Sequence, residues 1–210
     1  MEINAERVIE LVKSVRPLFM DHERASRITV KGAADFVTQV DFLVQERMRS
    51  GLFDMYPQVQ FMGEEKDNRD IDFSGAVWIL DPVDGTTNLI HDFRCSALSL
   101  ALCDRGQMEL GIIYQPYEDE LFLAQRGKGA FLNGNPIHVS SVKDLGQSLI
   151  SIGTSPYNHD LADRNFEDIK RVFLKCSDIR RTGSAAVDLA YVACCLLYTS
   201  DAADDSLRVD

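Results

Sequence analysis

The stretch W-I-L-D-P-V-D-G-T-T-N, residues 78–88, decides the fold prediction because an apolar run leads directly into two acidic residues and a turn. Residues 76–80 are almost continuously apolar, which is typical of a strand buried on both faces. Pro82 is expected to end the ladder, and Gly85 permits a tight turn. We therefore expect Asp81 and Asp84 to converge at the end of a buried strand, where a carboxylate is unfavourable unless it is paired or binds a metal.

The same stretch indicates a site for a cation and an anion together. Carboxylate oxygens suit Mg²⁺ better than zinc, which prefers His and Cys. Residues 85–88 are expected to begin a helix whose free backbone N–H groups face an anion such as phosphate. The alternative is an ordinary Asp/Pro/Gly loop with an Asx-type cap. Short Asp-Gly-Thr strings are weak signals alone, but the full string after an apolar strand is more specific.

Two further acidic clusters accompany this stretch. One is D-F-V-T-Q-V-D at residues 35–41, and the other is G-E-E at residues 63–65. Taken alone, Glu64 is more often part of a solvated turn than a ligand, and Asp41 on a helix is usually a surface charge. Their weight as candidate site residues comes only from occurring together with Asp81 and Asp84.

The rest of the chain predicts helices first, then a run of strands, then alternating helices and strands. An apolar stripe at spacings of three and four predicts one helix from Ala5 to Phe19, and Thr38 is a candidate N-cap for a second helix ending at Gly51. Later elements are expected as strands at 59–62, 95–103, 109–115, 121–124, 130–132, 148–152 and at Ile179, and as helices at 160–175 and 184–194. This order predicts an α+β or layered α/β fold.

Composition limits the classes of partner. The 210 residues are 45% hydrophobic and carry a net charge of −11, which argues against a nucleic acid or an anionic membrane as partner. No run approaches the ~18 apolar residues of a membrane span, and no basic-then-apolar signal region begins the chain. The five Cys form no C-x-x-C pair and are expected to be free thiols. A cytoplasmic protein is therefore expected.

Several motifs in order resemble the inositol monophosphatase family, part of the lithium-sensitive, Mg²⁺-dependent phosphatase superfamily. The match starts with D-x-V-T-x-x-D, G-E-E and W-I-L-D-P-V-D-G-T-T-N and continues with G-x-G-A-x-x-N-G at 127–134 and with segments 180–186 and 188–193. It covers roughly residues 3 to 194 in order. The implied fold is the αβαβα sugar-phosphatase sandwich, with an N-terminal α+β metal-binding half at 1–140 and a partial C-terminal α/β half at 141–194. Family members often form dimers, so a homodimer is a further expectation.

The resemblance also implies roles for individual residues. One Mg²⁺ would be held by Glu64, Asp81, the main-chain carbonyl of Val83, and Thr86. A second would take Asp81 and Asp84 with an Asp from the C-terminal half, and a third would contact Glu64 through waters. Thr86 and Asp41 would help to activate the attacking water, so the implied catalytic residues are Thr86, Asp41 and Glu64.

The implied substrate is a phosphate monoester of inositol or a similar small sugar, hydrolysed by metal-activated water. The backbone at Gly85, Thr86 and Thr87 would cradle the phosphate, while Gly183, Ser184 and Ala185 would approach the substrate's hydroxyls. Thr87-Asn88 resembles the inositol monophosphatase branch, because nucleotide-bisphosphate phosphatases tend to carry Lys-Glu there. A nucleotide-bisphosphate or fructose-bisphosphate phosphatase, or a regulatory interaction protein retaining the fold, stays open as an alternative.

The similarity ends after Cys194, where the chain continues C-L-L-Y-T-S-D-A-A-D-D. This string resembles a translated adapter from DNA library preparation. Residues 195–210 are therefore expected to be an unrelated, artefactual tail that leaves the C-terminal half incomplete, and a genuine divergent tail is the alternative. Because the Asp that completes the family's second metal site would lie beyond this point, the 210-residue chain is expected to have little or no activity.

Overall fold

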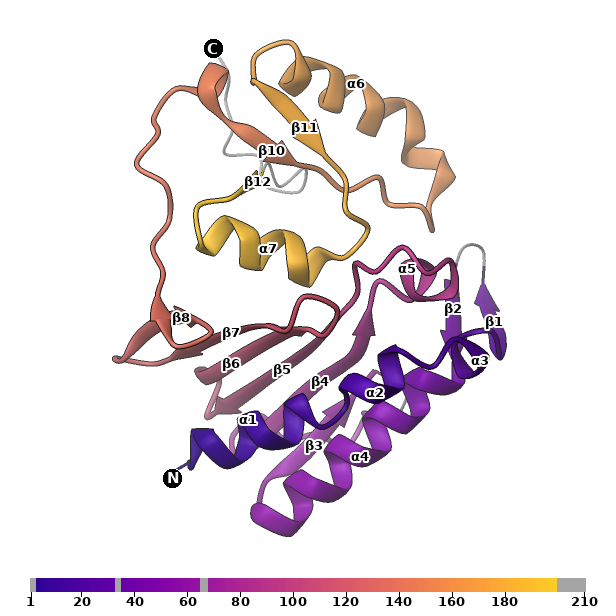
Figure 1. The fold of residues 1–210 in the computed structure, drawn as a ribbon, viewed down its shortest axis with the longest axis vertical. Helices are drawn as coiled ribbons and strands as arrows, with labels where there is room; N and C mark the ends of the chain where they lie inside the picture. The colour runs from indigo at the N-terminus through magenta and orange to yellow at the C-terminus, as the bar shows by residue number, and fades with distance from the viewer. Residues whose placement is uncertain (1–2, 33–34, 65–67, 200–210) are drawn as a thin grey trace.

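The computed structural model describes residues 3–32, 35–64 and 68–199, and it shows five layers (Figure 1). The largest layer is a seven-stranded sheet, and helices from the N-terminal part cover one of its faces. Helix α7 lies between its other face and a small three-stranded sheet, and helix α6 covers the far side of the small sheet. The layered α/β fold and the αβαβα order expected from the sequence are confirmed.

The large sheet has its strands in chain order. They are β3 (Gln60–Gly63), β4 (Ala76–Asp84), β5 (Ala97–Asp104), β6 (Gln107–Gln115), β7 (Glu120–Gln125), β8 (Gly129–Leu132) and β9 (Asn135–Pro136). Only β3 and β4 pair in parallel; the other neighbours pair antiparallel. The parallel pair matters for the site because the carboxyl ends of β3 and β4 meet at the same edge.

The N-terminal part contains the helices α1 (Ala5–Lys13), α2 (Arg16–Phe19), α3 (His22–Ala25) and α4 (Gln39–Met55). An antiparallel ribbon of β1 (Ile28–Gly32) and β2 (Asp35–Thr38) lies between α3 and α4 in the chain. The predicted stripe is buried as expected, but the helix is broken before Pro17, which lies at the start of α2. Proline lacks the N–H that a continuous helix needs, so two helices replace the one predicted.

Helix α4 begins after Thr38, as predicted, but it continues past Gly51 to Met55. A Cβ at Gly51 would come within 2.6 Å of Leu11 Cδ1, so the glycine permits α1 and α4 to approach closely instead of ending the helix. The prediction that Pro82 ends its strand was also wrong. Strand β4 runs to Asp84, and its register against β5 shifts between Asp81 and Asp84. This is a β-bulge, where a missing N–H is tolerated and the side-chain directions change.

The second part contains the elements that follow the large sheet. They are the 3₁₀ turns η1 (Leu145–Gln147) and η2 (His159–Leu161), strands β10 (Leu149–Ser151), β11 (Asp178–Arg180) and β12 (Tyr198–Thr199), and helices α6 (Ala162–Phe173) and α7 (Ala185–Ala193). The three strands are parallel in the order β11-β10-β12. The boundary expected near residue 140 falls between Pro136, which ends β9, and Leu149, which begins β10, and it stays a prediction.

The expected tail lies only partly within the described residues. Leu197 is buried and β12 pairs with β10, whereas residues 200–210 are outside the part that the structure describes. The assignment of 195–210 as an unrelated tail therefore stays a prediction. Across the described ranges, no helix has the length and apolar character needed to cross a bilayer.

Candidate active site

Two acidic residues leave the large sheet side by side. Gly63 pairs with Leu80 across the parallel strands, and the N–H of Glu64 then donates to the Leu80 carbonyl at 3.2 Å. Glu64 consequently follows the end of β3, next to Asp81 at the start of the bulge in β4, and their side chains share a hydrogen bond. Burial, then the negative charges of Glu64 and Asp84, raise the pKa of Asp81 to about 8.

The bulge in β4 leads into the short helix α5 (Thr86–Ile90). Asp81 Oδ1 accepts from the Val83 N–H at 3.1 Å, which holds the carboxyl against the turn. The Thr86 hydroxyl lies 3.0 Å from the Val83 carbonyl and 3.2 Å from Asp41 Oδ1, so its single proton has two acceptors within reach. The structure therefore brings together Thr86 and Asp41, the pair predicted to act on water.

Asp41 is held rigidly by the start of α4. Its Oδ2 accepts from both the N–H and the hydroxyl of Thr38, at 2.8 and 2.6 Å, while the Thr38 hydroxyl accepts from Val40 N–H at 3.1 Å. This is a capping box with Asp at the third helical position. Burial raises the pKa of Asp41, and the hydrogen bonds from Thr38 and Thr86 oppose that shift. The cap leaves Oδ1 directed to Thr86.

Asp84 connects the two parts of the chain. Its Oδ2 accepts from the Ser184 hydroxyl and from the Ala186 N–H, the latter at 2.7 Å. Ser184 is itself the N-cap of α7 and accepts from Val187 N–H. A carboxylate at a helix N-terminus is favourable because the first N–H groups of a helix lack partners within it.

The two predicted substrate-binding turns lie in direct backbone contact. Gly85 and Gly183 both adopt positive φ, at 90° and 89°. A Cβ at Gly85 would lie 3.2 Å from the Gly183 carbonyl and 3.3 Å from Ser184 Cβ, so a side chain there would push the turns apart. The two turns therefore form one surface. They are Gly85–Thr87 and Gly183–Ala185, which begin 98 positions apart in the sequence.

Sequence reasoning missed the residues that hold this surface together. Asn88 is buried, and its side-chain amide donates to the carbonyls of Cys95 and Thr182, which lie near the two turns. Asp188 is also buried and accepts from the Thr182 hydroxyl at 2.7 Å. Asn88 lies in the stretch 78–88, but in the sequence analysis it indicated only which branch of the superfamily the chain resembles. No local pattern indicates a hydrogen bond to a residue 94 positions away.

The predicted metal ligands lie in pairs and do not form a complete coordination shell. Within the described ranges, no three His, Cys, Asp or Glu side chains are arranged to hold an ion. The metal-ligand set Glu64, Asp81, Val83, Asp84 and Thr86 therefore stays a prediction, and so does the catalytic set Thr86, Asp41 and Glu64. The donors fit a hard cation, because all are oxygens and because burial, followed by the negative charges of Glu64 and Asp84, raises the pKa of Asp81. Glu65, the second acid of G-E-E, lies outside the described residues.

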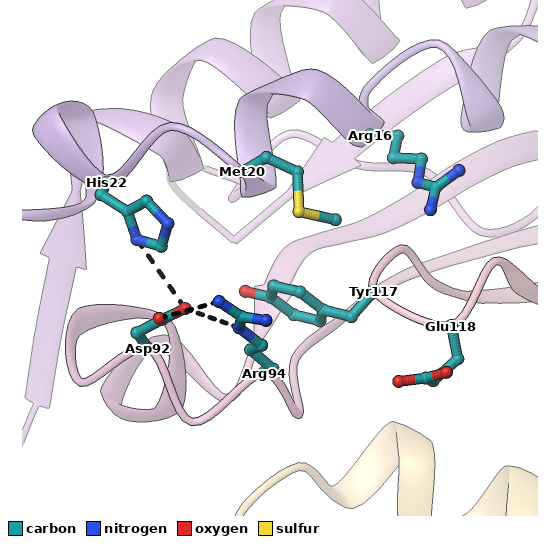
Figure 2. A pocket seen from close by; sticks show the side chains of 7 residues that line it. All are labelled: Arg16, Met20, His22, Asp92, Arg94, Tyr117 and Glu118. Atoms are coloured by element: carbon teal, nitrogen blue, oxygen red, sulfur yellow. Dashed lines mark hydrogen bonds and ion pairs between the residues drawn. The ribbon is translucent and has the colours of Figure 1, made fainter.

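A cavity of about 230 Å³ lies apart from these carboxylates, between the α2–α3 region and the loop after α5 (Figure 2). Its lining contains none of the predicted site residues. Figure 2 shows Asp92 between His22 and Arg94, at 3.7 and 3.2 Å. Because Asp92 pairs with Arg94, and Glu118 balances Arg16 across the lining, the cavity has no surplus positive charge for a phosphate group.

The five layers and the carboxylates at the ends of two parallel strands define a protein of the layered sugar-phosphatase fold. The sequence model of the inositol monophosphatase family matches residues 1–197. The chain belongs to that family.

Individual relatives agree with this assignment. The chain is 36% identical over 200 residues to an inositol monophosphatase of Dictyostelium discoideum, covering 90% of this chain and 72% of that protein. It is 37% identical over 163 residues to Nus factor SuhB of Escherichia coli strain K12, covering 78% of this chain and 61% of that protein, which is less than two thirds of its length. The crystal structure of the extragenic suppressor protein suhB from Bartonella henselae is similar, with a TM-score of 0.82 and 32% identity, covering 91% of this chain and 74% of that one.

Proposed function

We propose that this protein hydrolyses a phosphate monoester of inositol or of a similar small sugar with the help of Mg²⁺. The observation that carries the proposal is the Glu64–Asp81 carboxyl pair on the parallel strands β3 and β4, followed by the turn that brings Thr86 to Asp41. An acidic pair in which Asp81 is largely shielded from water is unfavourable by itself, and a cation would relieve it. Family membership and the inositol monophosphatase of Dictyostelium discoideum favour the same chemistry.

In this proposal Glu64, Asp81, Thr86 and the Val83 carbonyl would hold Mg²⁺, and Asp84 would contribute to a second site. The ion supplies a Lewis acid that offsets the negative charge of a phosphate group. Asp84 already accepts two hydrogen bonds at Oδ2 from the start of α7. A role for Asp84 as ligand would therefore couple metal binding to the position of α7.

Thr86 and Asp41 would act on the attacking water. When the Thr86 hydroxyl donates to Asp41 Oδ1, its oxygen can accept a hydrogen bond from water, and a proton taken from that water would be balanced by passage of the hydroxyl proton to Asp41. The capping box that holds Asp41 fixes the direction of that donation. Positioning of this kind lowers the entropic part of the activation barrier.

The substrate would lie across the two touching turns. The free N–H groups at the first turn of α5, at Thr86 and Thr87, would bind the phosphate, and Gly85 allows close approach because it has no side chain. The segment Gly183–Ala185 would face the sugar hydroxyls. The close approach of the two turns, which Gly85 permits because it has no side chain, favours a small substrate.

The test is phosphate release from inositol 1-phosphate with millimolar Mg²⁺ and with a chelator in its place, by this chain and by a version with a complete family C-terminus in place of residues 195–210. A parallel panel contains fructose 1,6-bisphosphate and a nucleotide bisphosphate. We expect release only with Mg²⁺ and fastest from the inositol ester. Equal release in the chelator would remove the metal from the proposal, and preference for a bisphosphate would replace the substrate class.

A regulatory interaction function is the second candidate, because one matched relative is named Nus factor SuhB. The acidic pair and the Thr86–Asp41 contact favour hydrolysis, since binding another protein requires neither. We include in the proposal a homodimer in the cytoplasm with no nucleic-acid or membrane partner. Light scattering of the purified chain measures the oligomeric state.

A further inference from the structure

One of the contacts between the two parts of the chain is made by a buried side-chain amide, that of Asn88. Asn88 lies on α5, and its Nδ2 donates to the Cys95 carbonyl at 2.6 Å and to the Thr182 carbonyl at 2.8 Å. The first bond anchors Asn88 within its own loop. The second crosses to the segment that leads into α7. Both amide protons are therefore used, one on each side of the contact between the parts.

The Asn88 side chain is closely packed against its neighbours. A Cβ at Gly183 would lie 2.9 Å from both Nδ2 and Oδ1 of Asn88, so the amide packs directly on the Gly183 backbone. Thr182 is fixed from its other side, because its hydroxyl donates to Asp188 Oδ1 at 2.7 Å. The Thr182 carbonyl is therefore held between a residue of α7 and a residue of α5.

Only a neutral amide meets this geometry with a side chain of this length. Two carbonyl oxygens face the same group, so that group must donate twice. A carboxylate at this position would bring negative charge against two carbonyl dipoles inside a buried site. Asp is nearly the same size as Asn, so the exchange of one for the other changes hydrogen bonding and little else.

We propose that Asn88 is the positioning residue that sets the separation between the phosphate-binding turn, Gly85–Thr87, and the sugar-facing turn, Gly183–Ala185. It thereby determines affinity for the sugar part of the substrate. This inference rests on the proposed function and deepens it. Asn88 acts through the Thr182 carbonyl and the Gly183 backbone, and it contacts no reacting atom.

The first experiment measures amide hydrogen exchange of the chain and of Asn88→Asp, without ligands. We expect exchange to rise about tenfold or more in peptides covering 84–95 and 182–194. Peptides covering 107–115 in β6 serve as the internal reference and stay unchanged. The matched control is Asn133→Asp, where the side-chain oxygen accepts from the Leu121 N–H and a carboxylate can do the same. Unchanged exchange in 182–194 with Asn88→Asp overturns the inference.

The second experiment separates affinity from turnover with inositol 1-phosphate. Asn88→Asp is expected to raise KM about tenfold while kcat stays within about threefold, because the catalytic pair is untouched. A loss confined to kcat overturns the positioning role. Both constants are measured in the chain with a complete family C-terminus in place of residues 195–210, because the 210-residue chain is expected to have little or no activity. If that protein releases no phosphate while exchange rises as expected, the proposed function fails and the structural role of Asn88 is supported.

A double-substitution cycle tests the same contact from the opposite side. Gly183→Ala places a methyl group against the Asn88 amide, so it disturbs the contact that Asn88→Asp also disturbs. The increases in exchange at 84–95 should then be clearly less than additive when the two are combined. Full additivity would show that the two residues act independently and would contradict the proposal.

Discussion

Replacing Asp81 with Asn should stabilise the metal-free protein at mildly alkaline pH. The pKa of Asp81 is raised from 3.8 to about 8 by burial and by the charges of Glu64 and Asp84. Because the folded state holds the proton more tightly than the unfolded chain, the stability contributed by neutral Asp81 is complete below about pH 4. It is lost progressively as the pH rises to about 8. Asn remains neutral throughout and carries no such loss.

The size of the effect follows from the shift in pKa. About four pH units correspond to an upper limit of ~6 kcal/mol in the free energy of unfolding, at ~1.4 kcal/mol per unit. Water reaches part of the carboxyl group, so screening reduces the expected difference to about 2 kcal/mol. For a chain of this size that is a difference of about 4–8 °C in Tm.

The assay is thermal unfolding in a chelator at about pH 4.5 and about pH 8, with Asp54→Asn as the matched control because Asp54 is exposed on α4. We expect Asp81→Asn to melt higher than the unsubstituted protein at the alkaline pH and nearly level with it at the acid pH. Millimolar Mg²⁺ should raise the Tm of the unsubstituted protein but not of Asp81→Asn. A Tm difference that does not change with pH would refute the reasoning.

Three further predictions concern the contacts around the site. Thr86→Ala removes the hydroxyl between Asp41 and the turn, so kcat for phosphate release should fall about 100-fold with folding intact. Thr86→Ser keeps the hydroxyl and should retain most activity. Equal loss in both variants would point to the methyl group instead. Ser184→Ala removes the N-cap of α7 and should lower the free energy of unfolding by about 1–2 kcal/mol in urea titrations; an unchanged midpoint would show that the cap is dispensable. Tyr191→Phe removes the 2.9 Å bond from the phenol to Glu120 and should cost about 1 kcal/mol by the same method, with no change in KM.

The sequence predicted local features well because each has a local cause. The apolar run before Asp81 forms a strand in a continuous sheet, and Thr38 caps α4 as its side chain requires. Pro82 and Gly51 were misread because tertiary contacts override local preference. Pairing with β5 continues beyond the bulge, and packing on α1 favours a glycine within α4.

The same difference between local and tertiary causes applies to the candidate site. The pairing of Asp41 with Thr86 was expected from the resemblance, and the structure places the two within hydrogen-bonding distance. The contacts of Asp84 and Asn88 with the start of α7 could not be predicted from spacing, because they depend on how two separate sheets pack around one helix. Which of the carboxylates bind metal stays a prediction.

The most direct test of the central claim is phosphate release from inositol 1-phosphate in millimolar Mg²⁺, comparing the unsubstituted protein, Asp81→Asn and Asp54→Asn. Because the 210-residue chain is expected to have little or no activity, each of the three proteins carries a complete family C-terminus in place of residues 195–210. The account then predicts release by the unsubstituted protein and by Asp54→Asn, with a loss of at least about 100-fold in Asp81→Asn. Because Asp81→Asn is expected to fold at least as well as its parent, that loss could not be attributed to unfolding. Equal release by all three proteins would contradict the assignment of the Glu64–Asp81 pair as the catalytic centre.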